Sequence, residues 1–222
     1  GQTITHIFLT HNHNDHSPLA KKLKEETGAK IYFKTLTSDF EDNDKFEEGY
    51  DKNIEGDIEL SNGDLVETSE WTIEAIHTPG HTSNHMCYSL LDEEILFSGD
   101  HVMGWSTTVI VPPDGNMNDY INSLKKLLKR SEKDFCPTHG PIIENPKDIL
   151  EKYITHRMER ERQIINAIKS GKNKIPDIVK IIYKDIDVGL HPAAAMSTLA
   201  HLKRMEKNNE IKISGENLDG TY

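Results

Sequence analysis

The stretch Thr10-His11-Asn12-His13-Asn14-Asp15-His16 decides how the rest of the chain is interpreted. It places three imidazoles and a carboxylate within six residues, directly after the apolar run 4–9. A strand that ends in such a cluster presents its polar side chains together at the edge of a sheet, and no packing argument favours so many polar rings there. Neutral imidazole nitrogens and carboxylates are ligands that a divalent ion prefers. The stretch therefore predicts one half of a metal site, and later segments must supply the other half.

The hydrophobic pattern predicts strands that alternate with helices, which favours an α/β architecture. A hairpin with a Gly-containing turn is expected to join 58–60 to 65–67, and the acidic segment 37–57 is expected to be an irregular surface loop. The other expected strands are 3–10, 30–33, 71–77, 86–91, 94–97 and 134–136, and the expected helices are 17–27 and 119–130.

The remaining metal candidates follow predicted strands, in Gly80-His81, Gly99-Asp100 and His139-Gly140. Strands that each deliver one ligand to the same sheet edge can build a compact site. With the first stretch they offer five imidazoles and two carboxylates, too many for one tetrahedral ion but suited to two ions that share a bridge. Asp100 is the natural bridge, because a carboxylate has two oxygens. A water between the ions would lose a proton near neutral pH and become the nucleophile.

The metal itself is expected to be zinc, with manganese or iron as alternatives, because no cysteine belongs to the ligand set. The two cysteines of the chain, Cys87 and Cys136, form no CxxC pattern. A disulfide framework is therefore not expected, which fits a reducing, cytoplasmic compartment. No apolar run approaches the roughly 20 residues of a membrane span, so no membrane partner is expected.

The charge and composition change near residue 145. The formal net charge of the chain is −11, yet acidic residues outnumber basic ones 26 to 12 over 1–145, and basic outnumber acidic ones 14 to 11 over 146–222. The acidic part lacks the basic footprint of a non-specific nucleic-acid binder. We therefore expect two domains with these bounds. The second resembles a winged helix, with helices at 146–170, 176–183 and 192–206 followed by a small hairpin whose first arm is Ile211–Ile213.

His11-Asn-His13-Asn-Asp15-His16 resembles the HxHxDH signature of the metallo-β-lactamase superfamily. The segments 78–82, 98–100 and 137–140 (Thr-Pro-Gly-His-Thr, Ser-Gly-Asp and Pro-Thr-His-Gly) resemble its later motifs, in the usual order. Within the superfamily the chain is most similar to the β-lactamase-like protein 2 group, whose animal member is a mitochondrial single-strand endoribonuclease. That similarity rests on 77–86, 104–108, 118–124 and 153–157, together with the winged-helix-like tail.

The resemblance implies a four-layer αββα sandwich that carries two ion sites bridged by Asp100. One site would use His11, His13 and His81, and the other Asp15, His16 and His139. Strands normally precede the HxHxDH signature in this family, so we expect those N-terminal strands to be missing from a sequence that begins at Gly1.

The expected function is metal-dependent hydrolysis, with Asp15 and Asp100 as catalytic residues. Asp15 would orient the attacking hydroxide as well as bind an ion. The segment 102–117 is expected to line the substrate cleft, where Ser106, Thr107 and Thr108 could bind the substrate by donating hydrogen bonds to a phosphate or a carbonyl.

The sequence does not decide between several classes of substrate. The close resemblance favours phosphodiesters of single-stranded RNA, whereas thioester or ester hydrolysis of the glyoxalase II kind shares the metal motifs. β-Lactam hydrolysis is disfavoured, because the set Asp15, His16 and His139 is not typical of true zinc β-lactamases. A non-enzymatic alternative is a module that binds nucleic acid or protein through its C-terminal domain. None of these patterns specifies an oligomeric state.

Overall fold

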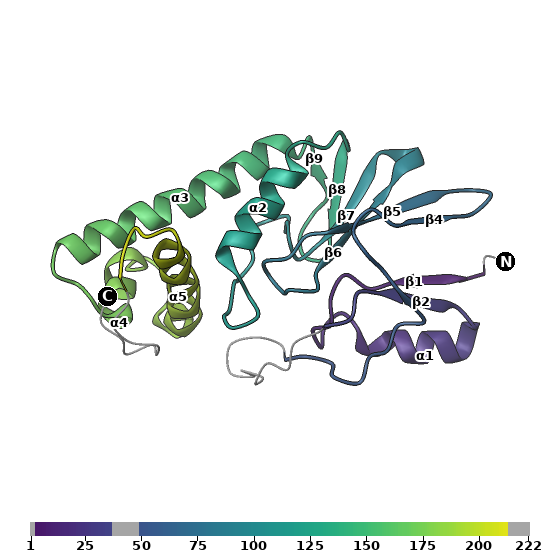
Figure 1. Ribbon diagram of the computed structural model, residues 1–222, viewed down its shortest axis with the longest axis horizontal. Helices are drawn as coiled ribbons and strands as arrows, with labels where there is room; N and C mark the ends of the chain where they lie inside the picture. Colours follow the sequence, from purple (N-terminus) through teal and green to yellow (C-terminus); the bar gives the residue numbers. More distant parts are fainter. Residues whose placement is uncertain (1–2, 37–48, 213–222) are drawn as a thin grey trace.

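Two β-sheets pack face to face, and helices cover their outer faces, in the computed structural model, which describes residues 3–36 and 49–212 (Figure 1). The smaller sheet has the order β1-β2-β3 with parallel strands, and the larger sheet has the order β4-β5-β6-β7-β8-β9. The strands are β1 (His6–Phe8), β2 (Lys30–Phe33), β3 (Ile58–Glu59), β4 (Leu65–Glu67), β5 (Thr72–His77), β6 (Met86–Leu90), β7 (Ile95–Gly99), β8 (Asp134–Pro137) and β9 (Ile143–Glu144). The predicted αββα sandwich is confirmed.

The side chains of the central strands alternate between two cores. On β5, Ala75 packs toward the smaller sheet, whereas its neighbour Ile76 belongs to the core beneath the helices. On β6, Tyr88 packs toward the smaller sheet, whereas its neighbour Cys87 belongs to the core beneath the helices. Successive residues of a strand point to opposite faces, so the larger sheet is apolar on both faces and must be covered on both.

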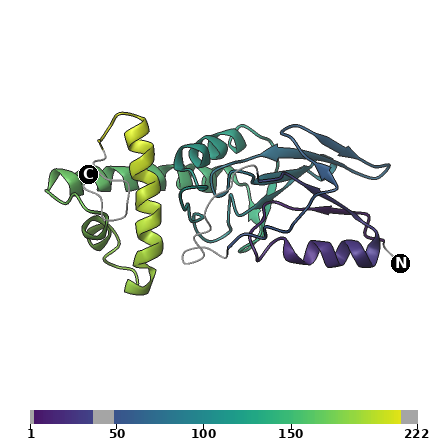
Figure 2. The same ribbon diagram turned by 60° about the horizontal axis from the view of Figure 1, so that its bottom comes forward.

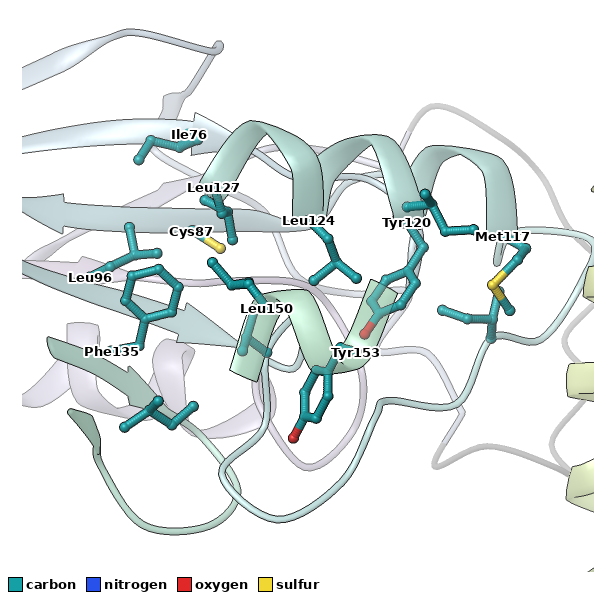
Figure 3. Packing of buried hydrophobic residues seen from close by; sticks show 14 of the residues in the cluster. Ile76, Cys87, Leu96, Met117, Tyr120, Leu124, Leu127, Phe135, Leu150 and Tyr153 are labelled. Atoms are coloured by element: carbon teal, nitrogen blue, oxygen red, sulfur yellow. The ribbon is translucent and has the colours of Figure 1, made fainter. Parts of the chain in front are cut away.

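Helices cover the two outer faces. Helix α1 (Pro18–Thr27) connects β1 to β2, and its Ala20 is buried against the smaller sheet. Helix α2 (Met117–Leu127) lies on the larger sheet, where its Leu124 and Leu127 belong to the same buried cluster as Leu96 and Phe135 (Figure 3). A short 3-10 turn, η1 (Leu91–Glu93), links β6 to β7.

The C-terminal part is a helical unit (Figure 2), and its buried residues form a core of their own. It comprises α3 (Lys147–Lys169), α4 (Ile175–Ile182), the 3-10 turn η2 (Val188–Leu190) and α5 (His191–Lys207). Helix α3 extends from the sandwich into this unit (Figure 1). Its residues Leu150 and Tyr153 belong to the core on the larger sheet, whereas Ile164 and Ala167 belong to the helical core. One helix thus contributes to both cores, and the division after residue 145 stays a prediction.

The predicted hairpin between 58–60 and 65–67 is wrong. Strand β3 pairs in parallel with β2 of the smaller sheet, whereas β4 pairs with β5 of the larger one. The chain does turn between them, with Gly63 N donating to the Ala75 carbonyl at 2.7 Å. However, buried Leu60 continues along β2 before the chain crosses to the other sheet. A turn signal fixes a change of direction but not the pairing partner.

Other differences from the sequence predictions are small. The strand predicted at 3–10 is regular only over His6–Phe8, and helix α2 begins at Met117 because the side chain of Asn116 caps it. Of the predicted loop 37–57, residues 37–48 lie outside the described part. The predicted arm Ile211–Ile213 also lies partly outside it, and Ile211 is not in a strand.

Within the described residues, no helix is both long enough and apolar enough to cross a bilayer.

Candidate metal centre

The ends of four strands supply the predicted ligands. Strand β5 is antiparallel to β6, and β6 is antiparallel to β7, so β5 and β7 run in the same direction, as does β8, which is parallel to β7. Their carboxyl ends therefore meet at one edge of the larger sheet. His81, Asp100 and His139 follow these ends, and the stretch 11–16 follows β1 of the facing sheet. The structure brings all seven predicted ligands to this edge.

His11, His13 and His81 form the first group, and all three are buried. His13 Nδ1 lies 3.0 Å from His11 Nε2 and 3.2 Å from His81 Nε2. Three imidazole nitrogens that converge in this way form a set that a zinc-like ion prefers.

Asp15, His16 and His139 form the second group, on the more open side of the cluster. Asp15 Oδ2 lies 3.1 Å from His16 Nε2 and 3.2 Å from His139 Nε2. This group combines two imidazoles with one carboxylate. It matches the second predicted site in composition.

Asp100 lies between the two groups. Its Oδ2 is 3.7 Å from His81 Nε2 and 3.5 Å from His16 Nε2, and its Oδ1 is 3.6 Å from His139 Nε2. One carboxylate thus reaches ligands of both groups. This is the placement that a bridging role requires.

The protonation of the ring nitrogens fits a bound cation. His81 Nδ1 lies 2.9 Å from the Val109 carbonyl, which can only accept, so Nδ1 carries the proton and the lone pair of Nε2 points into the cluster. His16 Nε2 is buried without a hydrogen-bond partner among the described residues, although two carboxylates lie near it. A cation between these atoms would satisfy the lone pairs of both nitrogens.

The electrostatics favour the ligand forms of His11 and Asp100. Burial, reinforced by the neighbouring imidazoles of His81 and His13, holds the pKa of His11 well below its ordinary value. Burial raises the pKa of Asp100, but the nearby His16 and the charge of His81 outweigh it, and the net pKa is lowered. At neutral pH the first group therefore offers a neutral imidazole and Asp100 a carboxylate. For His16, burial lowers the pKa, but the nearby carboxylates of Asp100 and Asp15 outweigh it and the net pKa is raised.

Two side chains to which the sequence analysis assigned no role, His85 and Thr138, hold Asp100 in place. His85 Nε2 accepts a hydrogen bond from the Asp100 backbone N–H at 3.2 Å, and its Nδ1 lies 2.9 Å from Thr78 Oγ1. Thr138 Oγ1 donates to Asp100 Oδ1. Gly99 allows this arrangement, since its φ is +53° and a Cβ there would lie 2.6 Å from His85 Nε2. The sequence signal was present: His85 and Thr138 lie within or beside the motifs.

The three predicted substrate-binding residues are placed differently from one another. Ser106 is exposed and Thr107 is half-buried, whereas Thr108 is 3% exposed. The hydroxyl of Thr108 lies 3.2 Å from His81 Nδ1, behind the ligand rather than in front of it. Ser106 and Thr107 remain candidates for substrate contact, and Thr108 is better suited to orienting His81.

A sequence profile of the metallo-beta-lactamase superfamily matches residues 1–139. The chain belongs to the metallo-beta-lactamase superfamily. A second profile, the beta-lactamase associated winged helix domain, matches residues 175–217 and confirms the predicted character of the tail. As a member of this superfamily, the chain is a metal-dependent hydrolase.

Curated relatives and solved structures agree with this assignment. The beta-lactamase-like protein 2 homolog of Drosophila melanogaster is 34% identical and aligns with 96% of this chain and 72% of its own length. An atrochrysone carboxyl ACP thioesterase of Aspergillus chevalieri is 28% identical over 85% of this chain and 55% of its own length. The crystal structure of a metallo-beta-lactamase family protein from Thermus thermophilus superposes with a TM-score of 0.79 at 18% identity, covering 98% of this chain and 79% of that one. At this identity the last similarity shows the fold alone.

Proposed function

We propose that this metallo-beta-lactamase superfamily hydrolase uses two divalent ions, held by the two ligand groups and bridged by Asp100. The observation that carries the proposal is that the two oxygens of Asp100 face ligands of both groups at 3.5–3.7 Å. Two bound ions would polarise the scissile group and activate a water molecule for attack.

The residues of the chain divide the remaining work. His11, His13 and His81 would hold one ion in the buried part of the cluster, and His16 and His139 would hold the other with Asp15. The side chain of Asp15 is 27% exposed, so its carboxylate can also accept the proton of the attacking water as a general base. His85 and Thr138 keep Asp100 in its bridging orientation.

The substrate class that we propose is a phosphodiester in single-stranded RNA. The support is the similarity to the β-lactamase-like protein 2 group over 96% of this chain and the winged-helix tail. The exposed residue Ser106 and the half-buried Thr107 would donate hydrogen bonds to the phosphate oxygens.

Thioester hydrolysis is the second candidate. It is favoured by the relative named as an ACP thioesterase, which aligns with 85% of this chain. Both candidate reactions would use the same ligand groups. They differ in the substrate that binds outside the metal cluster.

The test combines metal analysis with a substrate panel. We expect the zinc-, manganese- or iron-reconstituted chain to hold about two ions and to cleave a single-stranded RNA oligomer faster than an acyl-pantetheine thioester or a chromogenic cephalosporin. Asp100→Asn should abolish cleavage, and Glu93→Gln, which alters an exposed carboxylate away from the cluster, should not. About one ion per chain would contradict the binuclear site, and preferential cleavage of the thioester would select the second candidate.

A further inference from the structure

Trp105 is exposed beside the ligand cluster. Its side chain is 68% exposed, and its ring centroid lies 6.4 Å from the ring of His139, with 30° between the planes. The other tryptophan, Trp71, is half-buried and packs 4.9 Å from the ring of His6. Tryptophan is highly buried on average. Core packing therefore explains Trp71 but not Trp105.

The backbone around Trp105 is held on both sides. Before it, Met103 O accepts a hydrogen bond from Tyr153 Oη at 2.7 Å, and Gly104 N donates to the His139 carbonyl at 2.9 Å. After it, the Val109 carbonyl accepts from His81 Nδ1. The indole is thus carried by a segment tied to two ligands of the cluster.

Gly104 makes this close approach possible. A Cβ at Gly104 would lie 2.3 Å from the Pro141 carbonyl oxygen, so another residue there would push the segment away from His139. The backbone that carries the indole is therefore held beside His139 by close packing.

The chemistry of the segment favours a stacked planar group. Residues 102–116 contain no lysine or arginine, so this rim cannot recognise an anionic substrate through ion pairs of its own. Exposed aromatic rings bind unpaired nucleobases by stacking, and this recognition tolerates any base because every base has a planar face.

We propose that Trp105 is a stacking platform for the nucleobase next to the scissile phosphate. The inference rests on the proposed cleavage of single-stranded RNA. Ser106 and Thr107 follow the indole directly and would contact the phosphate of the same nucleotide. The ions would then supply the electrostatic attraction to phosphate, and the indole would supply the affinity for the base.

A binding experiment tests the platform directly. Trp71→Phe leaves Trp105 as the sole tryptophan, since the chain contains two. We expect a 2′-O-methyl RNA hexamer, checked by gel electrophoresis to stay intact during the titration, to quench the Trp105 fluorescence of the metal-loaded protein. An abasic hexamer with the same phosphates should quench it at least about tenfold more weakly at equal concentration. Equal quenching by the two oligomers would overturn the proposal. A titration in which an acyl-pantetheine thioester quenches the fluorescence and the RNA hexamer does not would also overturn it.

Kinetics supply the second readout. We expect Trp105→Ala to raise KM for RNA cleavage about tenfold with a smaller change in kcat and an unchanged metal content, and Trp105→Phe to restore most of the loss. An equal defect in the Ala and Phe variants would contradict stacking. If the wild-type protein cleaves no RNA, the proposed function fails, whereas the fluorescence titration still shows whether Trp105 binds a base.

Discussion

Arg157 of helix α3 donates a hydrogen bond to the backbone carbonyl of Thr108, the residue whose hydroxyl lies 3.2 Å from the ring of His81. Arg157 is 3% exposed, and its guanidinium lies 5.1 Å from the centroid of the Tyr120 ring. The helix that leads into the C-terminal unit is therefore connected to a candidate metal ligand through one buried segment.

This connection predicts that residues outside the ligand set control metal affinity. We expect Thr108→Val, which keeps the shape and removes the hydroxyl, to weaken metal binding about tenfold, because groups behind a ligand orient its ring. Arg157→Lys should have a smaller effect in the same direction. Competition with a fluorescent chelator measures both affinities.

The matched control lies on the same helix. Arg162 is exposed and pairs with Glu159 one turn earlier, so Arg162→Lys should leave metal affinity unchanged. If all three variants bind metal like the wild-type protein, the connection through Thr108 has no part in holding His81.

The two ligand groups should respond separately to mutation. His139→Ala removes a member of the open group and leaves His11, His13 and His81 intact, so we expect about one ion per chain after gel filtration. Asp100→Asn should reduce the metal content of both ligand groups, because the Asp100 carboxylate that it removes faces both. Elemental analysis of the purified variants measures which of the two loses more metal. A larger loss in His139→Ala than in Asp100→Asn would contradict the bridging placement.

Gly99 should be more sensitive to substitution than a glycine with similar backbone strain. Gly99→Ala adds a Cβ 2.6 Å from His85 Nε2 at a φ of +53°, whereas Gly63→Ala at φ +88° meets nothing within 4 Å. Both incur the cost of a left-handed backbone, roughly 1–2 kcal/mol, but only Gly99→Ala also displaces His85 and Asp100. We expect both to lower the free energy of unfolding and only Gly99→Ala to weaken metal binding. Equal metal affinity in the two variants would contradict this role of His85.

His201 predicts a loss of stability at acidic pH. Burial lowers its pKa from 6.5 to about 4, with Arg157 and Arg160 acting in the same direction and Glu161, 3.1 Å from Nδ1, opposing them. The folded pKa lies below the unfolded one, so this contribution is fully present above pH 6.5 and is lost as the pH falls through 4.

Urea unfolding of the metal-free protein at pH 7 and pH 4.5 measures this effect. We expect the wild type to lose about 2 kcal/mol more than His201→Gln between these conditions, because glutamine does not titrate. A difference between the two proteins that stays constant with pH would show that His201 is not the group that titrates.

Much of the site was predictable because its ligands carry their own signal. The cluster 11–16 has no structural explanation as a run of polar rings, and His81, Asp100 and His139 each follow a strand and adjoin a glycine. The order of these strands in the sheet converts that local pattern into one convergent site, as the distances around Asp100 illustrate.

The side chains behind the ligands could not be predicted in the same way. Arg157 and Thr108 are separated by 49 residues, and His85 reaches Asp100 from the start of β6 to the end of β7. Such partners are chosen by how the layers pack, and residue type alone does not specify them. The hairpin expected between 58–60 and 65–67 failed for the same reason, since the turn was correctly placed and its two arms belong to different sheets.

The stretch 10–16 by itself determined the kind of chemistry, a metal-dependent site, and its own candidate ligands, because ligand chemistry depends on residue type and spacing. The tertiary structure decided what surrounds those ligands: Asp100 placed between the groups, Thr108 turned to His81, and Trp105 left exposed at the rim. These features arise from packing between distant segments, and the free energy of that packing is not encoded in any one of them.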